Sequence, residues 1–272
     1  MLKIISDIGK NFIDKEGMTV QYYVERAITL IKSAKKAGAN IAKFQTHVFE
    51  DEKSKRSKDR YEWIKFNEKV TPITFWEELK RECDRQKIEF MTTPMSKMAA
   101  EKINHLVKRW KVSSADIIDF ELINYLKNTG KPIIISTGMS TQDQIEIVVR
   151  FLESQIEFIN YCVSLYPCPI YKINLTDLIR LSGKSEIPIG FSDHSLSVEV
   201  PALAVRMGTC AIEKHFTLNR EAFGPDHKVS LLPDEFKKMV SLCHLAEKQG
   251  ESFKEEKENW KKFRINNIKK QK

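Results

Sequence analysis

The sequence contains no apolar run that approaches the roughly 20 residues of a membrane-spanning helix. Its start also lacks the long apolar core and small-residue cleavage site of a secretory leader. Cysteine is scarce, with five residues in a chain of 272, and no two of them form a CxxC pair. An odd number of scattered cysteines disfavours both a disulfide framework and a zinc ribbon. We therefore predict a cytoplasmic protein.

The composition is that of a globular protein with a charged surface. Apolar residues make up 42% of the chain and charged residues 30%. The net charge of +8 raises the question of a nucleic-acid partner, but lysines and arginines are mixed with acidic residues everywhere except near the C-terminus. A solvated surface is the favoured interpretation, and a basic site for a small anionic substrate is compatible with it.

Short apolar runs alternate with longer amphipathic stretches along the whole chain, which is typical of βαβ units around a parallel sheet. The runs predict eight strands, over residues 3–7, 41–45, 88–91, 110–112, 132–136, 158–162, 187–191 and 210–213. The stretches predict eight helices, over residues 20–36, 75–85, 97–106, 120–128, 141–152, 175–181, 197–207 and 233–248. Pairs in such strict order favour a single-domain α/β fold, the (β/α)8 TIM barrel.

Residues typical of helix ends agree with this prediction. Thr141 and Ser197 stand where N-caps are expected, and Pro233 opens the last helix. A left-handed C-cap favours glycine, and four glycines follow expected helices: Gly38, Gly130, Gly183 and Gly208.

The predicted barrel covers residues 1–250 and a basic tail covers 251–272. The tail is rich in lysine and has no further hydrophobic pattern, which indicates a helix or a disordered end. Residues 50–69 form a long, highly charged insertion after the second strand. We expect this insertion to be partly helical, and a solvated surface excursion is favoured over a mobile lid on the barrel mouth.

In such a barrel the chemistry gathers at the carboxyl ends of the strands, so the residues that end each run are candidates for a site. Lys43 and Lys111 end the second and fourth runs, and a buried ammonium needs negative charge beside it. Hydroxyl groups that could donate to phosphate oxygens end the third to fifth runs: Thr93, Ser114 and Ser136. These residues predict an anion pocket. The alternative is that each lysine pairs with a carboxylate and the hydroxyls cap helices.

Acids and histidines end the first, seventh and eighth runs. His194 and His215 follow adjacent expected strands at matching positions, so their imidazoles could approach one metal. Two ligands fall short of a full set, which water and a substrate oxygen would complete. Imidazole with oxygen ligands permits Mn, Zn, Co or Fe. His227 lies in an expected loop, where a solvated histidine is favoured over a third ligand.

Seven motifs carry a resemblance to a known family. They are AGANIAKFQT, FMTTP, KVSSADIIDFELI, GKPIIISTGMST, YCVSLYPCP, IGFSDHS and IEKHFTLNREAFGPDHKVSLLPDEF. From about Lys3 to about Lys248, in order and without large gaps, the chain resembles the sialic acid synthase (N-acetylneuraminate synthase) family. These enzymes condense phosphoenolpyruvate with an N-acetylhexosamine to make nonulosonic acids.

The resemblance implies a role for each candidate residue. Residues expected to bind phosphoenolpyruvate are Lys43, Thr93, Lys111, Ser114, Ser136 and Ser164, the last standing where the family often has asparagine. Residues expected to face the sugar are Gln45, Tyr166, Glu213 and Asp226. The expected catalytic residues are Glu213, Asp7 and Lys111. His194 and His215 are expected to hold a divalent metal, typically Mn2+, with Mg2+ and Co2+ as alternatives.

The departures from the family fall on the sugar side. Asp7 stands where the family has a longer glutamate, and the loop that follows, through Phe12, lacks the family's histidine. The family usually continues into a small antifreeze-like domain that reaches the sugar of a partner chain with an arginine, and this sequence ends before such a domain. The acceptor aldose is therefore left open. So is the choice between a homodimer and a separate chain that supplies the domain.

The resemblance predicts a transferase that joins phosphoenolpyruvate to N-acetylmannosamine or a related N-acetylhexosamine and releases phosphate. One alternative is a related synthase for a different aldose. Another is a non-catalytic or partner-dependent barrel. A third is a metal-dependent aldolase with a pyruvate-like donor, which would release no phosphate. Neither nucleic acid nor a membrane is an expected partner.

Overall fold

The structure is a computed structural model that describes residues 2–178, 181 and 186–250. In this part of the chain, runs rich in isoleucine, valine and phenylalanine form eight strands, as β-branched and aromatic residues favour. The strands are β1 (Lys3–Gly9), β2 (Ile41–Thr46), β3 (Glu89–Pro94), β4 (Trp110–Val112), β5 (Ile133–Ser136), β6 (Ile156–Cys162), β7 (Ile189–Asp193) and β8 (Ala211–His215). All the strands that the sequence predicts are present, with ends shifted by a few residues.

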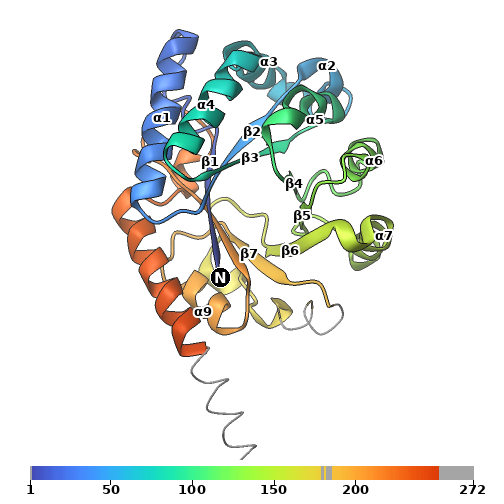
Figure 1. Cartoon of the computed structure of the whole chain (residues 1–272), viewed down its shortest axis with the longest axis vertical. Coiled ribbons are helices and arrows are strands. Elements are labelled where there is room, and N and C mark those ends of the chain that lie inside the picture. Colours follow the sequence, from blue (N-terminus) through green and yellow to red (C-terminus); the bar gives the residue numbers. More distant parts are fainter. Residues whose placement is uncertain (1, 179–180, 182–185, 251–272) are drawn as a thin grey trace, which may run out of the picture.

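Helices follow the strands and cover the outside of the sheet (Figure 1). They are α1 (Val20–Lys36), α2 (Phe49–Glu52), α3 (Tyr61–Val70), α4 (Ile73–Arg85), α5 (Lys97–Ile103), α6 (Phe120–Asn128), α7 (Gln142–Leu152), α9 (Val200–Arg206) and a last helix over residues 233–250. Short 3-10 turns lie at η1 (Lys58–Arg60), η2 (Asn104–Leu106), η3 (Glu153–Gln155), η4 (Ile170–Lys172) and η5 (His227–Val229). Three predicted features lie wholly or partly outside the described residues: part of the helix over 175–181, the cap residue Gly183 and the tail over 251–272.

The strands form one parallel sheet in the order β3-β2-β1-β8-β7-β6-β5-β4. Because β1 pairs with both β2 and β8, the first and last strands meet and the sheet curves into a barrel. Only β3 and β4, both described in full, lie side by side without a hydrogen-bonded ladder between them. The predicted TIM barrel is confirmed, and it has one unpaired seam.

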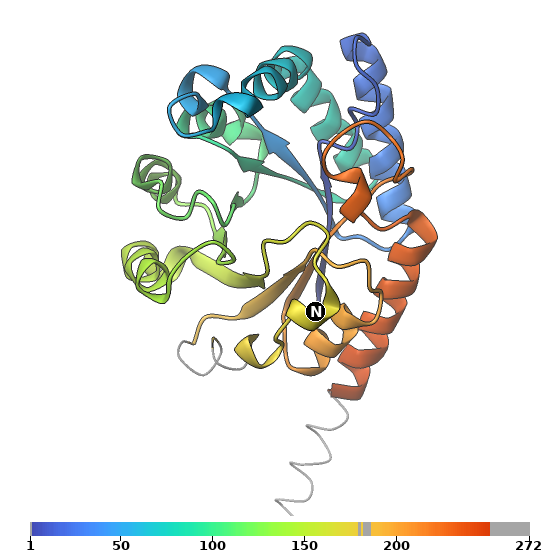
Figure 2. The ribbon, with the colours of Figure 1, turned by 180° about the vertical axis from the view of Figure 1, so that it is seen from behind.

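Helix ends follow the predicted signals with one shift. Thr141 caps α7 through its side chain. α9 begins at Val200 instead of residue 197, because Ser197 stays outside the helix and accepts hydrogen bonds from the backbone N–H groups of Glu199 and Val200. The predicted cap glycines in the described part of the chain have positive φ: Gly38, Gly130 and Gly208. Near Gly38 the last helix packs beside the end of α1 (Figures 1 and 2).

Alternation along the strands sorts the inward-pointing side chains into layers. An apolar cluster fills the lower interior: Ile5, Ile41, Met91, Ile134, Phe158 and Ala211. Two residues further along the same strands, the buried side chains are polar: Asp7, Lys43, Thr93, Ser136, Asn160 and Glu213. A larger apolar core lies between the sheet and the helices. The barrel therefore has an apolar floor and a polar layer that faces the carboxyl mouth.

Much of the charged insertion is exposed, as a solvated excursion predicts, but several of its side chains are buried, which the sequence did not indicate. It is partly helical, as expected, and contains α2, η1 and α3. Glu52 is fully buried, and Ile64, Asn67 and Val70 are buried as well. These four side chains fix the segment to the barrel after β2.

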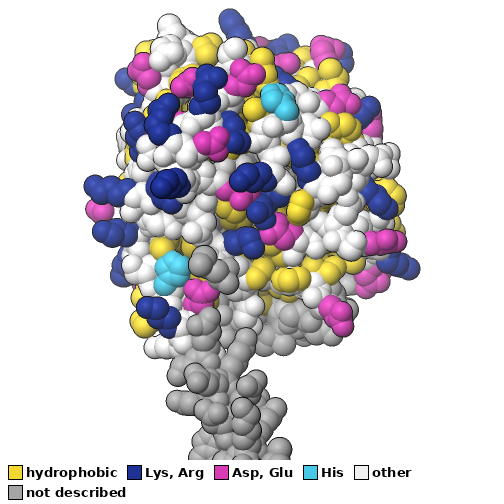
Figure 3. Space-filling model, in the orientation of Figure 1, with side chains coloured by type: hydrophobic (Ala, Val, Ile, Leu, Met, Phe, Trp, Pro, Cys, Tyr) yellow, Lys and Arg dark blue, Asp and Glu magenta, His cyan; other side chains and the backbone are white. Residues whose placement is uncertain are grey.

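The surface carries mixed charge. Figure 3 shows lysines and arginines interspersed with acidic side chains over one face of the molecule, as a solvated surface predicts. Among the described helices, none has the length and apolar character that crossing a membrane would require.

Gly190 on β7 gives a test of the packing inside the barrel. A Cβ atom at this position would lie 2.2 Å from Asn160 Oδ1 and 2.9 Å from the Phe158 ring. Because both neighbours are buried, Gly190→Ala should destabilise the protein by about 1–3 kcal/mol, measured by urea denaturation. Gly250→Ala is the control, since nothing lies within 4 Å of a Cβ there. Equal stabilities for the two variants would contradict this packing.

Candidate active site

The polar layer is built around two buried lysines from β2 and β4. Lys43 Nζ lies 2.7 Å from Asp7 Oδ2 and 3.7 Å from Glu213 Oε1. Lys111 Nζ donates to Ser136 Oγ at 2.6 Å and to the carbonyl of Val112 at 3.0 Å, and it lies 4.0 Å from Glu213 Oε1. The predicted lysines therefore meet at one carboxylate.

The two lysines differ in how firmly they hold their protons. Burial lowers the pKa of Lys43, but Asp7 and Glu213 outweigh it, so the net pKa is raised. For Lys111 burial dominates over the attraction of Glu213, and its pKa is lowered. Burial would raise the pKa of Asp7, but Lys43 and His215 lower it overall. Lys111 is thus the cation whose charge an incoming anion would stabilise most.

Two neutral side chains hold Glu213 in place. Ser192 Oγ donates to Glu213 Oε1 at 3.1 Å, and Asn160 Nδ2 lies 3.4 Å from Oε2. The prediction from the sequence missed both residues. Their signal is an inward-facing polar residue in an otherwise apolar strand, two positions before His194 for Ser192 and in the middle of β6 for Asn160.

The predicted metal ligands lie together at the ends of β7 and β8. The ring centroids of His194 and His215 are 5.7 Å apart. His194 Nδ1 donates to the carbonyl of Val163 at 2.8 Å, which leaves Nε2 as an acceptor. Burial, aided by His215, lowers the pKa of His194 to about 4, so its imidazole is neutral at neutral pH. His215 Nε2 lies 3.5 Å from Asp7 Oδ2.

These two imidazoles fit a metal as part of a ligand set. Within the described ranges, no group of three or more His, Cys, Asp or Glu side chains is arranged to hold a metal. His194 has a neutral ring with a free nitrogen, and His215 Nδ1 is buried without a hydrogen-bond partner among the described residues. Oxygen ligands would therefore have to come from water or substrate.

His227 is buried, which corrects the prediction of a solvated histidine. Its Nδ1 lies 2.7 Å from Thr217 Oγ1, so it anchors the loop after β8. No hydrogen bond or ion pair connects it to His194 or His215 in the part of the chain that the structure describes.

The predicted hydroxyl groups fall into two sets, one beside the lysines and one apart from them. Thr93 Oγ1 lies 3.5 Å from Lys43 Nζ. Ser114 and Ser164, which come from the loops after β4 and β6, lie 3.2 Å apart through their Oγ atoms. Gly138 keeps this place open, because a Cβ there would lie 2.5 Å from Ser164 Oγ. The hydroxyls of Ser114 and Ser164 thus form a pair separate from the lysines.

Two of the predicted sugar residues lie beside Gly9, which is two residues after Asp7 and has a φ of +54°. A Cβ at Gly9 would lie 3.3 Å from both Gln45 Nε2 and Asp226 Oδ2. Asp226 Oδ2 is buried and has no hydrogen-bond partner among the described residues. Tyr166 is about half exposed, and its ring centroid lies 4.2 Å from that of His194. An acceptor would meet polar groups on both sides of the histidines.

A buried ion pair behind the histidines joins β7 to β8. Asp193 and Lys214 are paired across the ladder, and their side chains are fully buried. Lys214 also donates to the carbonyl of Ser195, and Asp193 accepts from the Ser195 backbone N–H at 2.8 Å. Each partner immediately precedes one of the two histidines in sequence, so the pair fixes the backbone that carries them.

Comparison with known proteins identifies the family of the chain. The model of the NeuB family matches residues 30–254. An uncharacterized protein of Methanocaldococcus jannaschii, MJ1065, is 39% identical over 223 residues, which cover 80% of this chain and 65% of that protein. The N,N'-diacetyllegionaminic acid synthase of Legionella pneumophila is 31% identical over 245 residues, which cover 82% of this chain and 68% of that enzyme.

A solved structure is similar over most of the chain. It is the N-acetylneuraminic acid (sialic acid) synthetase of Leptospira borgpetersenii in complex with citrate. The TM-score is 0.81 and the identity 30%, and the match covers 91% of this chain and 84% of that chain.

The ion pair behind the histidines can be tested through stability. Lys214→Met should cost about 3–5 kcal/mol in the free energy of unfolding, because it leaves the Asp193 carboxylate buried and unpaired. Lys238→Met is the matched control, since its ion pair with Glu199 spans 3.7 Å between mostly exposed side chains. The control should lose less than about 1 kcal/mol. Similar urea midpoints for both variants would refute a structural role for Lys214.

Proposed function

Because this chain belongs to the NeuB family, we propose that it condenses phosphoenolpyruvate with an open-chain aldose to a nonulosonic acid and releases phosphate. N-acetylmannosamine or a related N-acetylhexosamine is the proposed acceptor. The names of two similar proteins, a legionaminic acid synthase and a sialic acid synthetase, support this class of product. This chain covers about two thirds of the length of the matched relatives. The acceptor is therefore to be identified by testing a panel of aldoses.

One observation carries the proposal. Two buried lysines, Lys43 and Lys111, meet Glu213 in a layer that also reaches the paired histidines through Asp7. A buried cation with a lowered pKa, such as Lys111, favours an anionic ligand beside it. Phosphoenolpyruvate brings both a phosphate and a carboxylate to such a place.

The chain's own residues would bind and orient the donor. The proposed ligands of phosphoenolpyruvate are Lys43, Thr93, Lys111, Ser114, Ser136 and Ser164. Lysines supply charge and hydroxyl groups supply directed hydrogen bonds, so the donor is held in one orientation. As phosphate departs, the same cations stabilise the charge that develops on it.

The acceptor would lie between the histidines and the loops after β1 and β8. Gln45, Tyr166 and Asp226 are the proposed contacts to the sugar, with Glu213 below them. His194 and His215 would hold the proposed Mn2+, with Mg2+ or Co2+ as alternatives. When bound, such a metal would supply Lewis acidity toward the aldehyde oxygen.

The proposed reaction balances without a further reactant. The methylene carbon of phosphoenolpyruvate forms a bond to the aldehyde carbon, whose oxygen takes up a proton and becomes a hydroxyl. Water adds to the carbon that carries the phosphate and gives up two protons, one to the former aldehyde oxygen and one to the departing phosphate, as the C–O bond to phosphate breaks and leaves a keto group. Glu213 is the proposed proton carrier, and Asp7 would hold Lys43 and His215 in place.

Two further statements stay predictions. They are a cytoplasmic location and, for the assembly, either a homodimer or a separate chain that completes the acceptor side. Each would be tested on the purified protein or in cells, apart from the chemistry.

The reaction is tested by phosphate release. Protein loaded with Mn2+ should release phosphate from phosphoenolpyruvate only when an aldose is present, and a panel of N-acetylhexosamines identifies the acceptor. Glu213→Gln should lower kcat by about 10²–10⁴-fold, because it keeps the volume and loses the proton carrier. Glu199→Gln, at an exposed site, is the control and should be unchanged. No aldose-dependent release from any acceptor would exclude the proposed reaction.

The metal site is tested by metal content. His215→Ala should reduce bound Mn2+ far below one ion per chain, because it removes one of the two imidazoles, and activity should fall with it. His105→Ala is the control, since that histidine is mostly exposed. Bound metal is measured by elemental analysis after dialysis. A variant that retains one ion per chain would show that His215 is not a ligand.

A further inference from the structure

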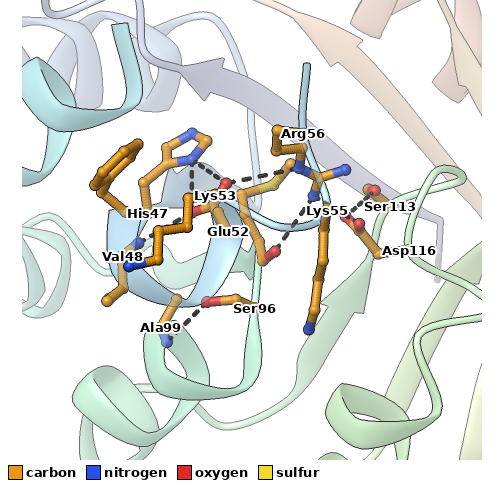
Figure 4. Close-up of polar contacts among 12 residues, drawn as sticks. His47, Val48, Glu52, Lys53, Lys55, Arg56, Ser96, Ala99, Ser113 and Asp116 are labelled. Carbon is orange, nitrogen blue, oxygen red and sulfur yellow. Dashed lines mark hydrogen bonds and ion pairs between the residues drawn. The ribbon is translucent and has the colours of Figure 1, made fainter. Parts of the chain in front are cut away.

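Arg56, in the charged insertion, spans the one seam of the barrel that has no ladder. Its Nη2 donates to Asp116 Oδ1 at 2.6 Å (Figure 4) and to the carbonyl of Met95 at 3.2 Å. Met95 follows β3, and Asp116 lies in the loop after β4. One guanidinium group therefore joins the two loops at the carboxyl end of the seam. A single amino group of the guanidinium, Nη2, donates both hydrogen bonds.

Each of these loops carries a proposed ligand of phosphoenolpyruvate. Thr93 lies two residues before Met95, at the end of β3. Asp116 accepts from Ser113 Oγ at 2.6 Å, and Ser113 directly precedes Ser114. Because β3 and β4, both fully described, share no ladder, backbone pairing does not set the distance between Thr93 and Ser114.

The base of Arg56 is itself fixed. Glu52, which is fully buried, accepts from the backbone N–H of Val48 at 3.0 Å and lies 2.9 Å from His47 Nδ1. Its Oε2 is 3.7 Å from Arg56 Nε. Figure 4 shows this chain of contacts from His47, just after β2, to Ser113. The bridge is thus anchored on a third strand.

We propose that Arg56 is a positioning residue for the phosphoenolpyruvate site, which it shapes by clamping the loops after β3 and β4 across the unpaired seam. This inference rests on the proposed function, since it assigns the clamped hydroxyls to the donor. Arg56 does not touch the donor; it acts through Met95 and Asp116.

The amino end of the same seam provides a matched control. Arg109, just before β4, forms an ion pair with Glu89 at the start of β3, with Nε and Oε1 2.6 Å apart. Arg109→Ala loosens the seam far from the mouth, whereas Arg56→Ala loosens it at the site. Lys55→Ala is a second control. Lys55 lies in the same insertion as Arg56 and pairs with Asp119, just before α6, but it makes no ion pair with β3.

The test is the affinity for phosphoenolpyruvate, measured by calorimetry without aldose. Arg56→Ala should weaken binding by roughly 10- to 100-fold. A shift of about 1 Å in the side chains that bind the donor has an effect of that order. The KM for phosphoenolpyruvate should rise in the same way, with the KM for the aldose changed less than about 3-fold. Arg109→Ala and Lys55→Ala should bind as wild type. Arg56→Lys, which keeps the positive charge on a shorter side chain, should be intermediate.

Hydrogen exchange separates this inference from the proposed function. Arg56→Ala should speed amide exchange at residues 95–98 and 113–117, whether or not a ligand is present. If wild type binds phosphoenolpyruvate and Arg56→Ala binds it equally well, the positioning role is wrong while the proposed function stands. If wild type binds none, both fail. Should Arg56→Ala not fold, Asp116→Asn removes the charged partner and should weaken binding in the same direction; unchanged affinity in that variant also overturns the role.

Discussion

The site depends on the mutual neutralisation of Lys43, Asp7 and Glu213 inside the barrel. A lone ammonium or carboxylate at this depth would lose its charge, because desolvation disfavours the ionised form. Pairing raises the pKa of Lys43 and lowers that of Asp7, so both favour their charged forms. Lys111 is the exception, since burial outweighs its contact with Glu213. The polar layer is therefore poised to accept an anion at one cation.

This charge cluster is tolerable because of what lies beneath it. The alternation of side chains along the strands places one apolar layer below the polar layer. This apolar layer separates the charge cluster from water at the amino end of the barrel. Ser192 then donates to the Glu213 oxygen that faces the lysines, and Asn160 donates to the other oxygen. Behind the histidines, Asp193 and Lys214 repeat the same logic outside the barrel, where they hold β7 to β8. Charge pairs thus serve as structural links wherever the site needs a fixed backbone.

The seam between β3 and β4 shows where prediction from the sequence ended. The apolar runs predict both strands, and the count of strand and helix pairs predicts a barrel. Whether a given pair of neighbours forms a ladder is decided by the curvature of the whole sheet, which no local pattern contains. The burial of part of the insertion could not be predicted for a related reason. Its many charges are typical of a solvated segment, but Glu52 and Arg56 find buried partners that are distant in sequence.

By itself, the sequence determined the alternation of strands and helices, the polar residues at the strand ends, and the motifs shared with one family. These features are local, because periodicity and side-chain chemistry are written along the chain. Only the tertiary structure decided which of those residues meet. It brought Ser192 and Asn160 under Glu213, buried His227 away from the histidine pair, and set Arg56 across the seam. The physical reason is that contacts between strands far apart in sequence depend on how the barrel closes, and closure is a property of all its strands together.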